Sequence, residues 1–235
     1  MLLEVKDLKV AYDGREVVKG VSFAVGKGEI FGIVGESGSG KSTIARSIVG
    51  LTAKSGGEIN INASSVQMVF QDAVGSLNPR MTAGQTLQEA LAHAVKRSPG
   101  AGGKPGDVHR LLDIVGLSPA VLGQYPREMS GGQCQRVSIA RALACGPEVL
   151  VADEPVSALD VSVQARVLNL LRDLRNNLDL SIILIAHDLA VVKNVCDRIA
   201  VMERGLIVEE GRPEEIFASP RTAYTARLLT AVPQI

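Results

Sequence analysis

Cysteine is scarce in this sequence of 235 residues. Its three cysteines, Cys134, Cys145 and Cys196, lie far apart and include no C-x-x-C pair. An odd number of widely spaced cysteines predicts neither a disulfide framework nor a zinc site. The pattern fits a protein of the reducing cytosol instead.

Long apolar runs and an excess of charge are also lacking. No uninterrupted apolar stretch approaches the roughly 18 residues that a membrane-spanning helix needs, and charges interrupt the apolar N-terminal run, so we expect no signal peptide. Lys and Arg together number 25, as do Asp and Glu, and the net charge is zero. We therefore expect no general attraction to nucleic acid or to an anionic membrane. If the protein works at a membrane, another chain must hold it there.

Apolar residues make up 46% of the chain, which is enough for one sizeable core. The order of predicted elements indicates an α/β core interrupted by a mostly helical insert at about 76–145. Asp13-Gly14 is typical of a hairpin turn, and the glycine-rich stretch 98–106 predicts a loose loop. Strands are predicted at 2–10, 16–25, 29–34, 58–61, 66–70, 148–152, 181–186 and 199–203, and helices at 41–49, 86–97, 107–116, 162–178 and 188–196, with one more starting at the segment MSGGQ.

The clearest motif is GESGSGKST at 35–43, which matches G-x-x-x-x-G-K-[ST] between a predicted strand and a predicted helix. Its glycines let the backbone turn sharply and point N–H groups inward, where the positive end of the helix dipole also favours phosphate oxygens. We expect Lys41 to reach the β- and γ-phosphates of a nucleotide and Ser42 to ligate Mg²⁺. The expected nucleotide-binding residues are Gly35, Glu36, Ser37, Gly38, Ser39, Gly40, Lys41, Ser42 and Thr43.

The segment EVLVADEP at 148–155 reads as an apolar strand that ends in two carboxylates. Open α/β sheets bind ligands at the carboxyl ends of their strands, so we expect Asp153 to hold the Mg²⁺ shell. Glu154 is then free to take a proton from, or to orient, an attacking water. This second acid favours a water-activating ATPase over a kinase, and the absence of an N/T-K-x-D motif argues against a GTPase.

Six motifs occur in a fixed order, namely GESGSGKST, FQD, MSGGQ, VLVADEP, SALD and IAHD. This set resembles the ATP-binding cassette (ABC) ATPases over essentially the whole chain. The resemblance implies ATP and Mg²⁺ as cofactors and an α/β P-loop NTPase fold, with a RecA-like core, an antiparallel β subdomain and a helical subdomain. It implies a single ABC ATPase domain over 1–235, with the core and β subdomain in 1–75 and 146–210, the helical subdomain with its signature motif in 76–145, and a short helical tail in 211–235.

The resemblance assigns roles to four further residues. Tyr12 resembles the aromatic residue that stacks on adenine, although a tyrosine in VAYDG fits a half-buried strand equally well. Gln71 resembles the residue that touches Mg²⁺ or the lytic water, and His187 resembles the one that contacts the γ-phosphate, so both join Glu154 as expected catalytic residues. Asp160 resembles the residue that links two ATP sites across a dimer, and it also fits the N-cap of the following helix.

The residues Ser130, Gly131, Gly132 and Gln133 open a predicted helix and form a second N-terminus able to bind an anion. The resemblance implies that this signature motif does not serve the nucleotide of its own chain. It closes over the γ-phosphate held by a partner subunit, in a head-to-tail dimer. The same atoms also make a helix cap, because Ser130 lies near the N-cap.

The stretch QMVFQDAVGSLNPRMT at 67–82 resembles the ATPase subunits of peptide, opine and nickel importers, as do 124–143 and the tail at 214–233. The implied partners are two transmembrane permease subunits, a second ABC ATPase subunit of the same or a different kind, and an extracytoplasmic solute-binding protein. Nucleic acid is not an expected partner. The expected location is peripheral, on the cytoplasmic face of the cell membrane.

Two other functions fit the general motifs. A soluble ABC ATPase acting on nucleic acid or ribosomes would usually carry two cassettes or a long coiled-coil insert, and this sequence has neither. ATPase stimulation by DNA or RNA would favour it. An exporter-type ABC ATPase would use the same chemistry, and the SLNP stretch argues against it.

Overall fold

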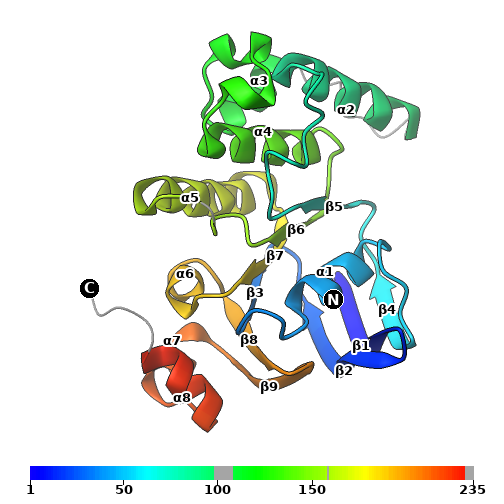
Figure 1. The fold of residues 1–235 in the computed structure, drawn as a ribbon, viewed down its shortest axis with the longest axis vertical. Coiled ribbons are helices and arrows are strands. Elements are labelled where there is room, and N and C mark those ends of the chain that lie inside the picture. Colours follow the sequence, from blue (N-terminus) through cyan, green and yellow to red (C-terminus); the bar gives the residue numbers. More distant parts are fainter. Residues whose placement is uncertain (98–107, 158, 231–235) are drawn as a thin grey trace.

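The computed structural model describes residues 1–97, 108–157 and 159–230 (Figure 1). This part of the chain forms two β-sheets with helices packed around them. The loop predicted at 98–106 and the last residues of the predicted tail, 231–235, lie outside the described residues.

The larger sheet has six strands in the order β5-β6-β7-β3-β8-β9. Its first five strands are parallel, and β9 runs antiparallel to β8. Every residue of β3, β6 and β7 is buried, as expected for parallel strands covered on both faces. The strands are β3 (Ile30–Val34), β5 (Val66–Val69), β6 (Val149–Asp153), β7 (Ser181–Ala186), β8 (Arg198–Glu203) and β9 (Leu206–Gly211).

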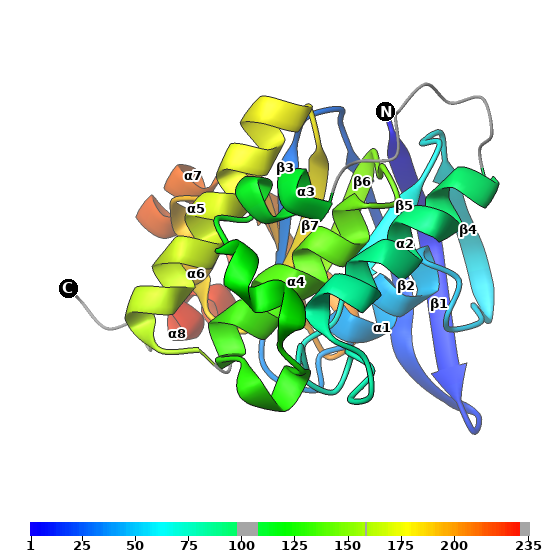
Figure 2. The ribbon, with the colours of Figure 1, turned by 90° about the horizontal axis from the view of Figure 1, so that it is seen from above.

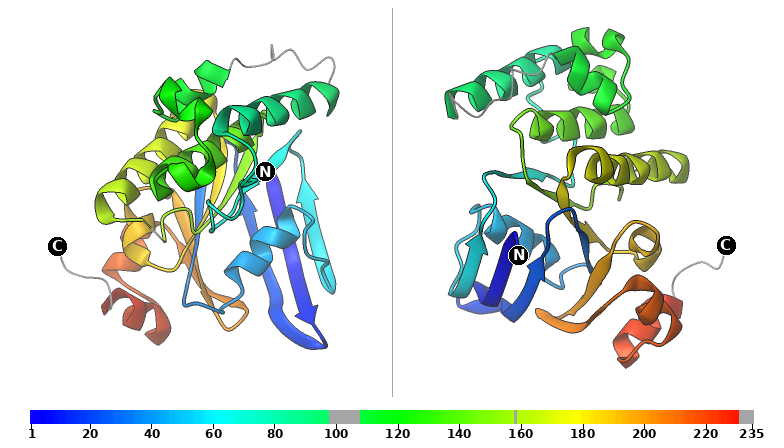
Figure 3. Two further views of the ribbon diagram at one scale, coloured as in Figure 1. Left: turned by 45° about the horizontal axis from the view of Figure 1, so that its top comes forward. Right: turned by 180° about the vertical axis from the view of Figure 1, so that it is seen from behind.

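The smaller sheet is antiparallel, in the order β2-β1-β4 (Figure 3). It contains β1 (Leu3–Tyr12), β2 (Arg15–Val25) and β4 (Gly56–Ile61). Asp13 and Gly14 join β1 to β2 with φ angles of 48° and 79°. Two left-handed residues in a row match a two-residue hairpin turn, so the predicted hairpin is confirmed.

Helices cover the six-stranded sheet in distinct groups (Figures 1 and 2). Helix α1 (Lys41–Ile48) lies between the two sheets, whereas α5 (Val161–Leu178) and α6 (Leu189–Lys193) pack on the opposite face of the larger sheet. The upper group in Figure 1 contains α2 (Ala83–Arg97), α3 (Val108–Ile114), α4 (Gly131–Leu143) and the short 3-10 helices η1 (Pro119–Gly123) and η2 (Pro126–Glu128). Helices α7 (Pro213–Ala218) and α8 (Ala223–Thr230) follow β9. No helix in these ranges combines the length and the apolar character needed to span a membrane.

Successive residues of the central strands face two different cores. In β7, Ile182 and Leu184 belong to the core under α4, α5 and α6, whereas Ile183 and Ile185 belong to the core shared with α1 and the smaller sheet. The two sheets also meet through Phe23, whose ring stacks on that of a β3 residue, Phe31, with centroids 5.2 Å apart. This double burial fixes the six-stranded sheet as the rigid platform of the molecule.

The parallel register brings three loops to one edge of the sheet. Val34 pairs with Ala186, and Asp153 pairs with Ile185, so β3, β6 and β7 end at the same level. The residues that follow these strands begin the phosphate loop, the acidic motif and the histidine motif of the sequence. The fold therefore gathers these three motifs at the carboxyl edge, where open α/β sheets bind ligands.

Candidate nucleotide site

The loop between β3 and α1 packs tightly on β8. Gly35 and Gly40 have φ angles of 155° and 109°, which side chains rarely tolerate. A Cβ on Gly35 would collide with the carbonyl oxygen of Met202, and one on Gly40 would lie 2.8 Å from the Met202 side chain. Only glycine therefore lets the loop lie this close to β8. Residues 36–38, at the tip of the loop, are exposed, whereas Ser39 is buried.

Lys41, the first residue of α1, directs its side chain back under this loop. The residue is 4% exposed, and Nζ donates hydrogen bonds to the carbonyl oxygens of Gly35 and Glu36, each 2.8 Å long. Burial lowers the pKa of the ammonium, and the nearby Glu154 and Asp153 act in the opposite direction. The ammonium is thus held beside the exposed residues 36–38, where it can bind anionic oxygens. Ser42 and Thr43, the next two residues, are half-buried.

Asp153, the last residue of β6, is 2% exposed. Its Oδ1 accepts a hydrogen bond of 2.8 Å from the hydroxyl of Ser42. Burial raises the pKa of the Asp153 carboxyl, whereas the Ser42 hydrogen bond lowers it. A buried carboxylate beside a hydroxyl offers the hard oxygen ligands that Mg²⁺ prefers, so these two residues fit that ion.

Glu154 opens the loop after β6 with a positive φ of 44° and donates its N–H to the carbonyl oxygen of Ile185 over 3.1 Å. Its Oε2 accepts a hydrogen bond of 3.0 Å from Nε2 of Gln71 and lies 3.4 Å from Nδ1 of His187. The structure therefore brings together all three expected catalytic residues, at the ends of β5, β6 and β7. A non-glycine residue in this backbone region is uncommon.

The signature residues form a complete helix cap. Ser130 Oγ accepts the N–H of Gln133 over 3.2 Å, and Gln133 Oε1 accepts the N–H of Ser130 over 2.8 Å. Gly132 packs so closely on α5 that a Cβ there would lie 2.5 Å from Cγ1 of Val163. Within the described residues, the N–H groups of Gly131 and Gly132 have no hydrogen-bond partner, as expected at the first turn of a helix. They remain available to an anion.

The structure does not join the signature residues to the phosphate loop of the same chain. Across the three described segments, no hydrogen bond or ion pair links residues 130–133 to residues 35–43. Figure 1 shows α4 in the upper helical group and α1 below it beside the smaller sheet. The two predicted anion-binding helix starts are therefore separate surfaces of one chain.

Tyr12 and Asp160 lie at the margins of the site. Tyr12 is 45% exposed at the end of β1, and its hydroxyl lies 3.4 Å from Oγ1 of Thr52, which follows α1. Asp160 is the N-cap of α5, where its carboxylate accepts the N–H of Val163 over 3.0 Å. A hydrogen bond from the Ser162 hydroxyl is the main reason why the pKa of the Asp160 carboxyl is lowered. The N-cap expected for Asp160 is confirmed.

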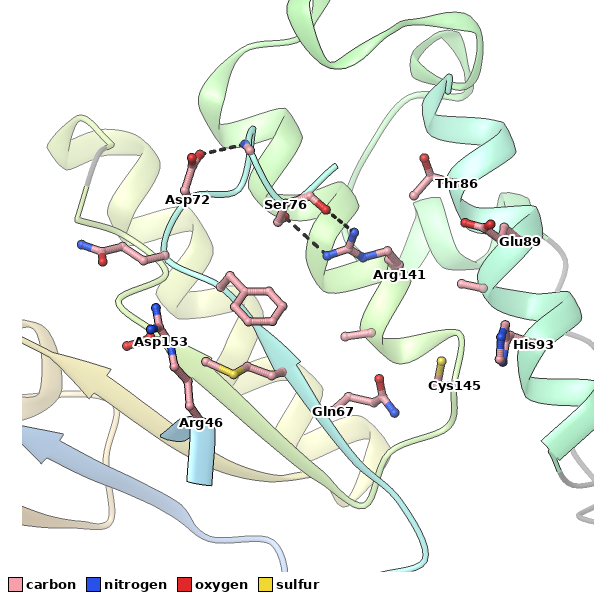
Figure 4. Close-up of a pocket in the computed structure, with 16 residues that line it drawn as sticks. Arg46, Gln67, Asp72, Ser76, Thr86, Glu89, His93, Arg141, Cys145 and Asp153 are labelled. Atoms are coloured by element: carbon pink, nitrogen blue, oxygen red, sulfur yellow. Dashed lines mark hydrogen bonds between the residues drawn. The ribbon is translucent and has the colours of Figure 1, made fainter. Parts of the chain in front are cut away.

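A groove of about 720 Å³ borders the site on the side of the helical group (Figure 4). Asp72, Glu89 and Arg141 line it together with Asp153, so one surface runs from the groove to the acidic motif. Arg141 donates a hydrogen bond of 2.6 Å to the carbonyl oxygen of Ser76. This contact connects α4 to the loop that carries Gln71.

Two residues with contacts at the site were not predicted from the sequence. The hydroxyl of Tyr224, in α8, accepts the N–H of Glu36 over 3.0 Å. Arg141 fixes the Gln71 loop as just described. The sequence predicts only a helical tail around Tyr224, and no local pattern marks a contact with a residue 188 positions earlier.

The sequence profile described as "ABC transporter" matches residues 18–157 of the chain. The chain belongs to the ABC transporter family, as one of its ATP-hydrolysing subunits, and its α/β fold is the P-loop NTPase fold of the family's ATP-binding cassettes.

Two relatives illustrate where it stands within the family. The oligopeptide transport ATP-binding protein OppF of Lactococcus lactis subsp. lactis (strain IL1403) is 44% identical, over 100% of this chain and 81% of OppF. The protein of the same name from Escherichia coli (strain K12) is 43% identical, over 99% of this chain and 78% of its own length. Both similarities extend well beyond the nucleotide-binding motifs.

Solved structures agree with the fold. The structure of cbiO1 from Clostridium perfringens, part of the ABC transporter complex cbiONQ, has a TM-score of 0.78 at 27% identity, over 93% of this chain and 91% of that chain. The ATP-binding cassette MJ0796, in a dimeric post-hydrolysis state bound to ADP and Pi, has a TM-score of 0.75 at 28% identity, over 90% of this chain and 98% of that chain. The predicted fold class is confirmed, and as a member of this family the chain binds ATP.

Proposed function

We propose that this chain powers an importer that takes up peptides. The observation that carries the proposal is the cluster of Glu154, Gln71 and His187 beside the phosphate loop. It occurs in a chain 44% identical over its whole length to an oligopeptide transport ATP-binding protein. That relative favours peptide import over the exporter and nucleic-acid alternatives.

ATP binds along the phosphate loop. The N–H groups at the start of α1 and the ammonium of Lys41 hold the β- and γ-phosphates. Lys41 now bonds to the carbonyl oxygens of Gly35 and Glu36, and phosphate oxygens are stronger acceptors, so binding offsets the desolvation of its charge. Tyr12 stacks on the adenine from the exposed end of β1.

Ser42, Asp153 and Gln71 are the residues that would hold Mg²⁺, and the bound ion would neutralise charge on the phosphate oxygens. The short hydrogen bond between Ser42 and Asp153 shows that two of these side chains already point at one place. Burial raises the pKa of the Asp153 carboxyl, and a bound cation would oppose that shift by attracting the charged carboxylate.

Hydrolysis requires a base near the γ-phosphate. Glu154 accepts the proton of the attacking water, and the Gln71 amide and the His187 ring hold its carboxylate in position. His187 has a half-exposed side chain, which leaves it free to contact the γ-phosphate. The fixed backbone at Glu154 limits movement of the base during the step.

A second ATPase subunit completes each site. The N–H groups of Gly131 and Gly132, with Ser130 and Gln133, close over the γ-phosphate bound by the partner, and Asp160 lies at the interface between the two sites. The separation of the two helix starts within one chain supports this arrangement. The dimeric state of the MJ0796 cassette bound to ADP and Pi gives a structural precedent.

Two permease subunits hold the ATPase at the cytoplasmic face of the membrane, and a solute-binding protein delivers the peptide. A permease segment docks in the groove beside the Gln71 loop, which is open to solvent and continuous with Asp153. The chain works as one domain, with core and β subdomain in 1–75 and 146–210, helical subdomain in 76–145 and tail in 211–235.

The test is Glu154→Gln in the complete importer reconstituted in vesicles. Loss of the base should lower phosphate release by at least about 100-fold and stop uptake of a labelled oligopeptide, while MgATP remains bound. Glu148→Gln is the matched control, because Glu148 precedes the other end of β6 and its carboxylate accepts only the N–H of Ser64 among the described residues. Normal hydrolysis by Glu154→Gln would contradict the role of Glu154. Uptake of nickel but not of oligopeptide by the unmodified importer would contradict the solute class.

A further inference from the structure

A single peptide unit of the phosphate loop is held from both sides. The carbonyl oxygen of Gly35 accepts the ammonium of Lys41, and the N–H of the next residue, Glu36, donates to the hydroxyl of Tyr224 over 3.0 Å. The C=O and N–H of a trans peptide point in opposite directions within the peptide plane, so Lys41 and Tyr224 contact opposite edges of this peptide unit. The orientation that Tyr224 imposes on the plane also sets where the carbonyl oxygen meets Lys41.

Tyr224 is itself firmly placed. It is 4% exposed, and its hydroxyl donates to the carbonyl oxygen of Met202 over 3.4 Å. That oxygen is the one that a Cβ on Gly35 would strike, so the hydroxyl bridges the phosphate loop and β8 where the two lie close together. Burial raises the pKa of Tyr224, which keeps the hydroxyl neutral and able to donate and accept at once.

The start of α8 is anchored to β9 independently of the loop. The carboxylate of Glu209, which is 6% exposed, accepts the N–H groups of Arg221 and Thr222. The hydroxyl of Thr222 then accepts the N–H of Thr225 over 3.1 Å and caps α8. Tyr224 therefore connects the start of α8, which is fixed on β9, to the phosphate loop. The glycines of that loop would otherwise allow it several conformations.

We propose that Tyr224 is a positioning residue for ATP binding, which acts by fixing the Gly35–Glu36 peptide and, through it, the ammonium of Lys41. The inference rests on the proposed ATP site. Without the hydroxyl, the peptide can rotate and the loop loses part of its preorganisation for phosphate. The role belongs to the oxygen atom alone, because a phenylalanine ring would fill the same space.

The experiment compares Tyr224→Phe with the unmodified full-length chain by isothermal titration with MgATP and by thermal unfolding without nucleotide. Loss of one hydrogen bond should raise the dissociation constant about three- to tenfold. The melting temperature should fall by no more than about 4 °C. Thr222→Val is the matched control, since it removes the α8 cap and leaves the Tyr224 hydroxyl in place, so its dissociation constant should equal that of the unmodified chain.

An unchanged dissociation constant in Tyr224→Phe would overturn the inference, whether or not the melting temperature falls. An equal rise in Thr222→Val would also overturn it, because any loosening of α8 would then weaken binding. Failure of the unmodified chain to bind MgATP would instead refute the proposed function, so the two failures are distinguishable.

Discussion

Cys134 directly follows the signature residues 130–133 and yet has no exposed surface. Its thiol donates to the carbonyl oxygen of Pro126 over 3.4 Å, and burial raises its pKa. Both effects lower reactivity, because an alkylating agent needs access and a thiolate. We expect iodoacetamide at about pH 8 to leave Cys134 unmodified in the native chain and to modify it in denaturant, as read by peptide mass spectrometry. Rapid alkylation of the native chain would contradict the observed packing of α4.

At the residue scale, the sequence predicted where the motif residues lie, but it did not predict the contacts that distant residues make with them. The strand-end rule placed Asp153 and Glu154 at the ligand edge because it depends only on short-range sequence. The hydrogen bond that the phosphate loop donates to Tyr224 depends on how Glu209 of β9 holds the residues just before α8, and no local pattern encodes that placement. Cys134 is likewise buried by its place in the large core, which is built from residues throughout the chain.

At the scale of elements, the approach of α4 to α5 depends on one glycine. A Cβ at position 132 would lie 2.5 Å from Cγ1 of Val163. Gly132→Ala should therefore lower the free energy of unfolding by about 1–3 kcal/mol, as overpacking does elsewhere, measured by urea denaturation. Gly123→Ala is the control, because nothing lies within 4 Å of a Cβ there. An equal free energy of unfolding for the two variants would contradict this, because it would show that α5 can move away from α4 without loss of stability.

The predicted elements agree with the structure where their pattern is strong. The buried strand predicted at 181–186 matches β7, and the helix predicted at 162–178 matches α5 within one residue. Strand β9 was not predicted, because its residues are mostly half-exposed and include Glu209 and Glu210, so it lacks an apolar pattern. Residues 206–211 form a strand because they pair with β8. The helix predicted at 188–196 is shorter in the structure, where α6 ends at Lys193.

At the scale of the whole molecule, one chain presents two unlike helix starts, both of which we propose bind phosphate. The start of α1 carries Lys41 and faces Asp153 and Glu154, whereas the start of α4 has only backbone N–H groups and a cap. No hydrogen bond or ion pair among the described residues joins them. A chain that carries these two starts on separate surfaces is suited to a dimer in which each ATP lies between two chains.

The central claim is that Ser130 acts on nucleotide bound by another subunit. The most direct test measures MgATP affinity and phosphate release of Ser130→Arg in the assembled ATPase. Loss of the cap costs only about 1 kcal/mol of stability, so folding should persist. Ser118→Arg is the control, because Ser118 caps η1 through its own side chain and gains the same charge. The account predicts that Ser130→Arg binds MgATP within about twofold of normal, the affinity being set by the chain's own phosphate loop, and releases almost no phosphate. Normal phosphate release by this variant would contradict it.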